Sequence, residues 1–230
     1  MDILKDTVNA VLTAVPHMRT LLFDSNPLPV NALYRAPYLT YLSVGRAFMT
    51  DSTYTLFPSV RHAIVSSNTW NHFLFKYQGR QMKTIHVSLV EPGLEYAATP
   101  LRDIERSCPN LAHLILYLEH PPVPLLGPLP RLRYIGLHFA QPEVDLRKRP
   151  WALMQALMAL DCSAPRVVRF LNADVAEHMR VYLERGEKMG TELLGRVTGG
   201  MLQLQDPTGR RIVPYSQATS NGPDIVKYVI

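Results

Sequence analysis

A short unit of one proline and three apolar residues recurs along the chain, and polar or irregular stretches separate its copies. An apolar residue comes two positions after the proline, a second three positions later, and a third after two more. Six copies have the proline, at Pro16, Pro37, Pro58, Pro109, Pro130 and Pro165. A seventh has Arg80 in its place, and successive copies lie 21, 21, 22, 29, 21 and 35 residues apart. The apolar sets are Met18/Leu21/Phe23, Leu39/Leu42/Val44, Val60/Ala63/Val65, Met82/Ile85/Val87, Leu111/Leu114/Leu116, Leu132/Ile135/Leu137 and the incomplete Val167/Phe170.

This spacing predicts a chain of stacked structural repeats. Self-similarity at a period of about 20 to 29 residues, with apolar positions in the order L-x-x-L-x-L, is typical of a leucine-rich-repeat solenoid. Each unit ends in a short strand, and the strands pair in parallel because no single repeat buries its own apolar face. We therefore predict an α/β leucine-rich-repeat solenoid of about seven repeats over residues 16–173, with the strands on its concave face. An ordinary α/β domain with coincidental prolines is the alternative.

Two flanking segments are expected to close the ends of the solenoid. An N-terminal capping helix over residues 1–15 would shield the open edge of the first repeat. Its apolar positions at helical spacing are Leu4, Val8, Val11, Leu12 and Val15. Residues 174–230 are predicted to form a C-terminal cap and tail. In that cap, a helix begins near Asp174, Gly186 ends it, and a hairpin follows around the turn from Asp206 to Gly209.

The two longest steps between copies leave room for helices on the return path. Thr99 followed by Pro100 predicts a helix start, because threonine caps a helix and proline suits its first position. The segment opened by Trp151 is apolar nearly all round, so it is expected either to be buried or to cover an interface. Asn26 and Asn68 occupy the position where the longer repeat motif carries a turn asparagine.

Composition narrows the class of protein. Two cysteines, Cys108 and Cys162, have no metal-ligand spacing and favour a reducing compartment, so we expect an intracellular protein, cytoplasmic or nuclear. No apolar run reaches the 18 or more residues of a membrane-spanning helix, and the N-terminus carries acids where an export signal has a basic region. The net charge of +5 permits acidic partners without by itself indicating nucleic acid.

Motifs that would indicate an enzyme are missing from the sequence. It contains no G-x-S-x-G, glycine-rich phosphate loop, H-E-x-x-H or C-x-x-C. Catalytic groups can assemble without a motif, but nothing in the chain argues for them. We therefore predict a protein that is not an enzyme and has no cofactor.

The positions between the inward apolar residues predict a column of side chains on the concave face. The residue just before the second apolar position of each copy is Thr20, Tyr41, His62, Thr84, His113, Tyr134 or Arg169. Neighbouring positions add His86, Tyr117 and His138. One residue earlier, a partly basic row consists of Arg19, Arg61, Lys83 and Arg133. Tyrosine and histidine combine rigid contact area with a polar group, which is favoured at recognition surfaces.

Each of these residues also has a simpler interpretation. Aromatic residues stabilise sheets by packing against neighbours on the same face, so Tyr41 and Tyr134 can be structural. Four histidines on one face suggest a metal site, but no carboxylate or cysteine completes it, and we predict none. The basic row is either a solvated edge or a track for phosphates.

Three stretches resemble the repeats of fungal F-box/leucine-rich-repeat proteins. They are Cys108-Pro109-Asn110-Leu111-Ala112-His113-Leu114, Leu129-Pro130-Arg131-Leu132-Arg133-Tyr134-Ile135 and Phe57-Pro58-Ser59-Val60-Arg61-His62. The resemblance covers about residues 16–172 and implies that the repeats hold the substrate of a ubiquitin ligase, while an F-box docks to a Skp-type adaptor. The 15 residues before the first repeat do not match an F-box, so the adaptor is an expected partner only if an F-box lies outside this chain.

The sequence thus predicts a protein–protein interaction module whose concave face recognises another protein. The expected contact residues are Tyr41, His62, His86, His113, Tyr117, Tyr134, His138, Arg19, Arg61, Lys83 and Arg133. The alternative is a nucleic-acid-binding repeat protein that uses the same basic and aromatic face. No membrane association is expected.

Overall fold

A computed structural model of the chain describes the repeats and the segments next to them. The described residues are 10–11, 14–23, 37–44, 58–66, 75–76, 78–89, 94–118, 129–140, 153, 155, 157–158, 166–185 and 188–214. The chain divides into two compact units, Met1–Ala112 and His113–Ile230. The boundary between them lies inside the predicted solenoid.

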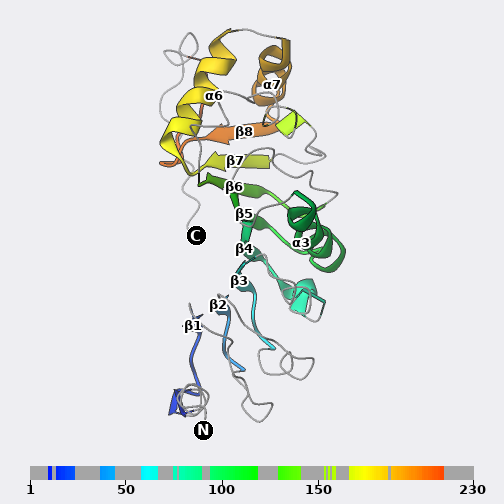
Figure 1. Cartoon of the computed structure of the whole chain (residues 1–230), viewed down its shortest axis with the longest axis vertical. Coiled ribbons are helices and arrows are strands. Elements are labelled where there is room, and N and C mark those ends of the chain that lie inside the picture. Colours follow the sequence, from blue (N-terminus) through cyan, green and yellow to red (C-terminus); the bar gives the residue numbers. More distant parts are fainter. Residues whose placement is uncertain are drawn as a thin grey trace. The chain divides into compact units, whose positions relative to one another are not determined.

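The first unit contains four parallel strands that follow one another in chain order (Figure 1). They are β1 (Thr20–Phe23), β2 (Tyr41–Val44), β3 (His62–Ser66) and β4 (Thr84–Leu89). A 3₁₀ turn, η2 (Gly79–Gln81), precedes β4, and helix α3 (Leu94–Ser107) follows it. Each strand lies at the end of a predicted unit and begins one residue before the second apolar position of that unit.

Hydrogen bonds between successive repeats fix the register of this unit. Thr20, Tyr41, His62 and Thr84 are aligned from strand to strand. The residue just before each strand offers its carbonyl oxygen to two N–H groups of the next repeat: Arg19 accepts from Thr40 and Tyr41 at 2.9 and 3.0 Å. Thr40 and Arg61 repeat this arrangement toward β3 and β4. A step of 21 or 22 residues therefore places equivalent positions side by side.

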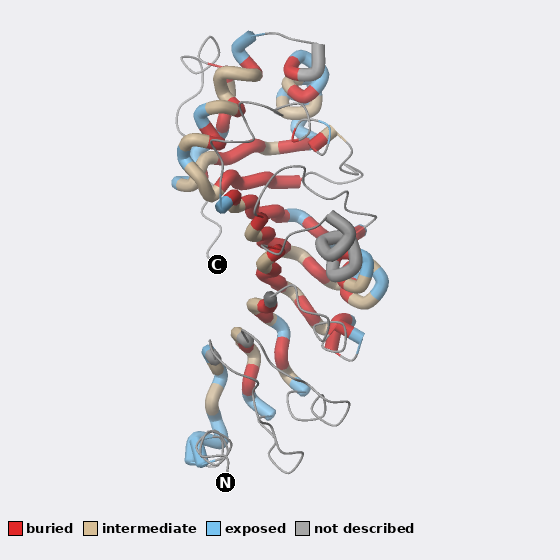
Figure 2. The backbone as a smooth tube through the Cα atoms, in the orientation of Figure 1, coloured by how far each residue is buried: buried red, intermediate tan, exposed pale blue. Residues whose placement is uncertain are grey.

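The apolar positions of the second, third and fourth repeats form the core, as predicted, whereas Met18 and Leu21 of the first repeat are only half-buried (Figure 2). The first position of the triplet is fully buried in Leu39, Val60 and Met82, and the second is fully buried in Leu42 and Ile85. Each such side chain contributes about 1.5–3 kcal/mol when it is removed from water, and this sum holds the repeats together. Gly79 sits against the end of α3, where an added Cβ would clash with the Ser107 carbonyl oxygen.

The second unit has four more parallel strands in chain order. They are β5 (His113–Leu118), β6 (Tyr134–Phe139), β7 (Arg166–Phe170) and β8 (Leu202–Gln205). Helices α6 (Ala173–Arg185) and α7 (Lys188–Thr198) connect β7 to β8. Within each unit, the parallel α/β arrangement in chain order confirms the predicted class; the assignment to leucine-rich repeats is a finer statement that the fold alone does not establish.

The last repeat is in a different register from the predicted one. Val167 aligns with Tyr134, and Arg169 aligns with Gly136. The predicted place of Arg169 in the column is therefore wrong, because Phe170 occupies the third apolar position rather than the second. The incomplete triplet of this repeat gave two possible alignments, and the pairing selects the one that buries both Val168 and Phe170.

The predicted helical return segments are partly confirmed. Helix α3 begins at Leu94, so Thr99 and Pro100 lie inside it, and the predicted helix start there is wrong. In the segment opened by Trp151, the described residues are helical; Leu153 and Leu157 are buried and Gln155 is exposed. Trp151 itself lies outside the described residues.

The predicted caps differ in outcome. Residues 10, 11 and 14 are helical, but Val11 and Val15 are 42% and 47% exposed, so these two positions do not shield apolar surface. Leu4, Val8 and Leu12 lie outside the described residues.

At the C-terminal end, α6 confirms the predicted helix, and its face with Val175, Met179 and Leu183 is buried. Helix α7 was not predicted. The turn Asp206–Gly209 is present, with Gly209 at a φ of 86°, but it leads to a single antiparallel bridge between Gln205 and Arg211 rather than to a full hairpin. The first arm, β8, instead continues the parallel sheet beside β7.

An asparagine that the sequence analysis did not select ties two strands together. The Asn172 side-chain amide nitrogen donates to the Phe139 carbonyl oxygen at 3.0 Å, and its oxygen accepts from the Phe139 N–H at 2.8 Å. This pair of bonds extends the β6–β7 ladder by one step after β7 has ended. The predicted turn asparagines, Asn26 and Asn68, lie outside the described residues.

Replacing Asn172 with leucine is expected to lower the free energy of unfolding by about 2 kcal/mol, because both Phe139 backbone groups lose their partner. Urea unfolding followed by circular dichroism measures the change. Asn110→Leu is the matched control, since Asn110 makes one bond, from its amide to the Arg80 carbonyl oxygen. Equal losses from the two substitutions would contradict the assigned role of Asn172.

Candidate functional site

The strands of the first unit present one set of alternate side chains on the side opposite the core. We call this set the first-unit face: Thr20, Leu22, Tyr41, Ser43, His62, Ile64, Thr84 and His86. Leu22 is 67% exposed, which is unusual for a large apolar side chain. Tyr41 and His62 are half-buried, whereas Thr84 and His86 are buried. The face is thus most open over β1 and becomes less open toward β4.

Aromatic rings on neighbouring repeats lie against each other in this unit. The rings of Tyr41 and His62 stack with centroids 6.2 Å apart and planes 20° apart. In the turns before β1 and β2, His17 and Tyr38 are 4.9 Å apart, and Tyr38 is 53% exposed. The register explains both pairs, since each joins equivalent positions of successive repeats. Two predicted contact residues, Tyr41 and His62, therefore form one rigid feature.

Burial keeps the histidines of this face neutral near physiological pH. Desolvation lowers the pKa of His62, and the nearby Arg61 charge lowers it further. Desolvation also lowers the pKa of His86, with a smaller contribution from His62. The Nε2 atom of His86 is buried and has no hydrogen-bond partner in the part of the chain that the structure describes.

A basic row runs along the strand starts of the first unit. Its positions are Arg19, Thr40, Arg61 and Lys83, which the register aligns one residue before each strand. Arg19 and Arg61 are exposed and Lys83 is half-buried. The positively charged positions predicted for this unit therefore do form a row, with a threonine in its second place.

The second unit presents a different surface from the equivalent positions. Tyr134, Ile115 and Val167 are 2%, 4% and 7% exposed and form an apolar cluster, against which Tyr117 and Leu171 pack. Burial raises the pKa of the Tyr134 hydroxyl, an effect that the Arg169 charge opposes. Tyr134 was expected to contact a partner, but in this structure its side chain stabilises the sheet from within.

The remaining predicted residues of the second unit surround this cluster. His113 lies 5.8 Å from Tyr134, and Tyr117 lies 5.4 Å from His138, measured between ring centroids. His113, Tyr117 and His138 are half-buried, while Arg133 in the preceding turn is exposed. His113, Tyr117 and His138 lie on one sheet face.

Arg169 is a buried cation that the predicted register misplaced. Its side chain is 9% exposed, and its Nε and Nη2 atoms donate to the Gln205 Oε1 atom at 3.1 and 2.9 Å. Its guanidinium carbon lies 5.5 Å from the centroid of the Tyr134 ring, a cation–π arrangement. Gln205 is fully buried, so this neutral side chain, rather than a carboxylate, accepts from the cation.

The described residues do not assemble a metal site. None of their histidine, cysteine and acidic side chains form a group that could hold a metal ion. Cys108 is a buried free thiol whose pKa is raised to about 12 by burial, so it is not a reactive thiolate. Cys162 lies outside the described residues.

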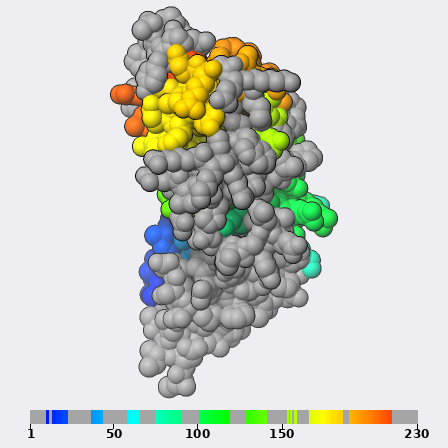
Figure 3. All heavy atoms as spheres, turned by 45° about the horizontal axis from the view of Figure 1, so that its top comes forward, coloured from blue at the N-terminus to red at the C-terminus, as the bar shows by residue number. Residues whose placement is uncertain are grey.

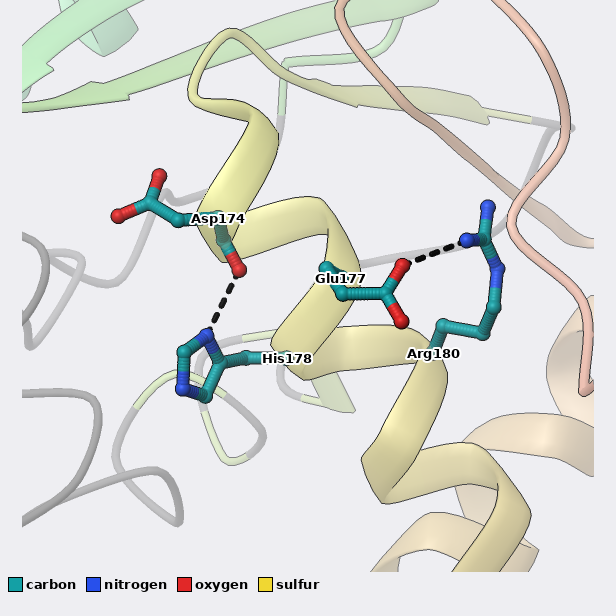
Figure 4. Close-up of polar contacts among 4 residues, drawn as sticks. All are labelled: Asp174, Glu177, His178 and Arg180. Carbon is teal, nitrogen blue, oxygen red and sulfur yellow. Dashed lines mark hydrogen bonds and ion pairs between the residues drawn. The ribbon is translucent and has the colours of Figure 1, made fainter.

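The polar contacts of α6 are local to the helix (Figure 4). The His178 ring nitrogen Nδ1 contacts the Asp174 carbonyl oxygen at 2.7 Å, one turn away, and Arg180 pairs with Glu177 at 2.6 Å. The space-filling view shows α6 (yellow) at the surface of the molecule (Figure 3). Such contacts within one exposed helix support its fold and do not form a reaction centre.

Sequence reasoning missed three residues that shape these surfaces: Leu22, Tyr38 and Gln205. Leu22 was detectable, because it lies between two inward apolar residues and must therefore point outward. Tyr38 follows a repeat proline directly and was detectable from its turn position. Gln205 gave no signal, because the sequence did not indicate that β8 pairs with β7.

Comparison with known proteins gave no family for this chain. No family model matches it, and neither the curated proteins nor the solved structures contain a match. None of the helices in the described ranges is long and apolar enough to span a bilayer. The resemblance to F-box proteins therefore stays a prediction.

The first unit is expected to lose stability as the pH falls below about 6.5, the pKa of an unperturbed histidine. His62 and His86 have lowered pKa values in the folded protein, so the unfolded chain takes up protons first. The contribution of these two histidines to the free energy of unfolding is complete above about pH 6.5. It is lost as the pH falls through their pKa values in the folded protein. Urea midpoints between pH 8 and pH 5 test this, and the variant H62Q/H86Q should give a flatter profile. An unchanged profile would assign the pH dependence to other groups.

Replacing Gln205 with leucine is expected to destabilise the second unit by about 2–3 kcal/mol, because the buried Arg169 guanidinium loses its acceptor. The double variant R169M/Q205L should recover most of this loss, since it removes the buried charge together with its partner. Unfolding free energies of the two single variants and the double variant give the coupling. If the double variant shows the sum of the two single losses, Arg169 does not depend on Gln205.

Proposed function

We propose that this protein is a binding module that holds a segment of another protein on the first-unit face. The observation that carries the proposal is the 67% exposure of Leu22 beside the half-buried stack of Tyr41 and His62. An open apolar side chain next to rigid aromatic surface is the composition of a protein contact. The face lies on strands whose register is fixed by the core, so it is preformed before a partner arrives.

The repeats support a more specific version of this proposal. Parallel strands in chain order, a step of 21 or 22 residues and buried L-x-x-L-x-L positions favour a leucine-rich-repeat solenoid. The resemblance to fungal F-box proteins would make the bound protein a ubiquitin-ligase substrate. A Skp-type adaptor would bind only to an F-box outside this chain, and failure of the complete gene product to co-purify with that adaptor would exclude this role.

Selection from a random peptide library displayed on phage tests the binding function directly. The purified chain is expected to enrich related peptides, and the variant L22D/Y41A is expected to lose at least about tenfold in affinity for them, because both open contacts are removed. V15D is the matched control: Val15 is an exposed aliphatic residue of the same unit that lies outside the first-unit face. Failure to enrich peptides, or equal losses in the two variants, would contradict the proposal.

Nucleic-acid binding is the second candidate, and the exposed Arg19 and Arg61 beside Tyr41 favour it. A labelled single-stranded RNA or a DNA duplex would then bind with an affinity that falls steeply with salt. The variant R61A/R133A would weaken that binding across all sequences. Peptide enrichment without nucleic-acid binding would exclude this candidate.

A further inference from the structure

The four repeats of the first unit have an unusual charge distribution. Their turn and strand segments, residues 16–23, 37–44, 58–66 and 80–89, contain no aspartate or glutamate, although the chain has 19 acidic residues. The same segments contain Arg19, Arg61, Arg80 and Lys83. All four basic residues lie in the turns before the strands, so the strands themselves contain no charged residue and the turn segments contain only positive ones.

The backbone holds the basic row in place while its side chains reach outward. The carbonyl oxygens of Arg19 and Arg61 each accept two N–H groups from the next repeat, and that of Lys83 accepts from Ala112 at 3.0 Å. No ion pair involves Arg19, Arg61 or Lys83 within the residues that the structure describes. Among the described residues, Arg19, Arg61 and Lys83 therefore occupy the first, third and fourth places of the row without an ion-pair partner (Figure 1 shows the strand starts).

The length of the row matches an extended peptide. Neighbouring strands lie about 4.8 Å apart, so the row from β1 to β4 spans about 14 Å. An extended chain advances about 13 Å over four residues, and its alternate side chains point to the same side. The row has a gap of about 10 Å between Arg19 and Arg61, across Thr40, and a gap of about 5 Å between Arg61 and Lys83. An extended segment of about five residues therefore spans the row, and the long arginine and lysine side chains allow its carboxylates to reach the three cations.

We propose that the partner of the first-unit face is an acidic polypeptide segment whose carboxylates pair with Arg19, Arg61 and Lys83. This inference rests on the proposed function, because it names the chemistry of the segment that the face binds. The apolar residues of the segment contact Tyr41 and Leu22, and its acidic residues contact the basic row.

The surroundings of the row favour a protein over a nucleic acid. Leu22 offers an open aliphatic contact, which a base does not need and a peptide side chain fills. The Tyr41 and His62 rings already stack on each other, so their facing sides are not open to a base. The cations lie in one row, and the two histidines beyond it have lowered pKa values that keep the rest of the face uncharged.

The peptide selection described above tests this inference when the selected sequences are read for charge. On the unmodified chain, aspartate and glutamate are expected to be enriched by at least about threefold over the starting library. The variant R19E/R61E is expected to lose that enrichment and to select lysine or arginine instead. The control R102E/R106E makes the same change in net charge at exposed residues of α3 and should still select acidic peptides.

A selected peptide then allows the contribution of its carboxylates to the binding affinity to be measured. Replacing its acidic residues with glutamine or asparagine is expected to weaken binding to the unmodified chain about tenfold in fluorescence anisotropy at low salt, and to make little difference with R19E/R61E.

The outcomes separate the two proposals. Enriched peptides without an acidic preference, or an acidic preference that survives R19E/R61E, would overturn this inference and leave the binding function standing. No enriched peptide at all would overturn the binding function and with it the inference. A labelled single-stranded RNA of 20 nucleotides, bound by the unmodified chain and not by R19E/R61E in the absence of peptide binding, would assign the row to nucleic acid.

Discussion

The hydrogen bonds between successive strand starts are the constraint on which both units depend. The carbonyl oxygen before each strand accepts N–H groups of the next repeat, as Arg19 does from Thr40 and Tyr41. This contact fixes the register, and the register decides which side chains face the core and which face outward. A slip by one residue would exchange the two sets, burying polar groups and exposing the apolar triplets. The position of every candidate binding residue follows from it.

The same register produces two different surfaces. In the first unit the outward positions leave Leu22 and the Tyr41–His62 stack open, whereas in the second unit Tyr134 closes a cluster with Ile115. In the second unit, Tyr117 and Leu171 pack against the buried cluster of Ile115, Tyr134 and Val167. The repeat architecture therefore sets the places of the contact residues, and the packing among the outward side chains decides whether a partner can reach them.

The sequence pattern predicted the register of the strands correctly where the repeats are complete and incorrectly where they are not. The strands of the first unit begin where the triplets place them, because three apolar residues define a unique inward face. Only two apolar residues were recognised in the last copy, Val167 and Phe170, so Arg169 was placed two residues out of register. The burial of Tyr134 and the pairing of β7 with β8 depend on contacts between distant segments, for which local periodicity carries no signal.

The charge pattern of the repeats separates selection for folding from selection for binding. A fold requirement alone would keep all charges out of the strand segments, because both signs lose solvation when they are buried. In the second unit the segments 129–140 and 166–171 again lack acidic residues, yet they contain Arg131, Arg133, Arg166 and Arg169. There, Arg169 is buried and satisfied by the neutral Gln205, so it is part of the packing. In the first unit, Arg19 and Arg61 are exposed without an ion pair from the described residues, so their charges, like those of the exposed Arg131 and Arg133, are not required by the packing of the strands.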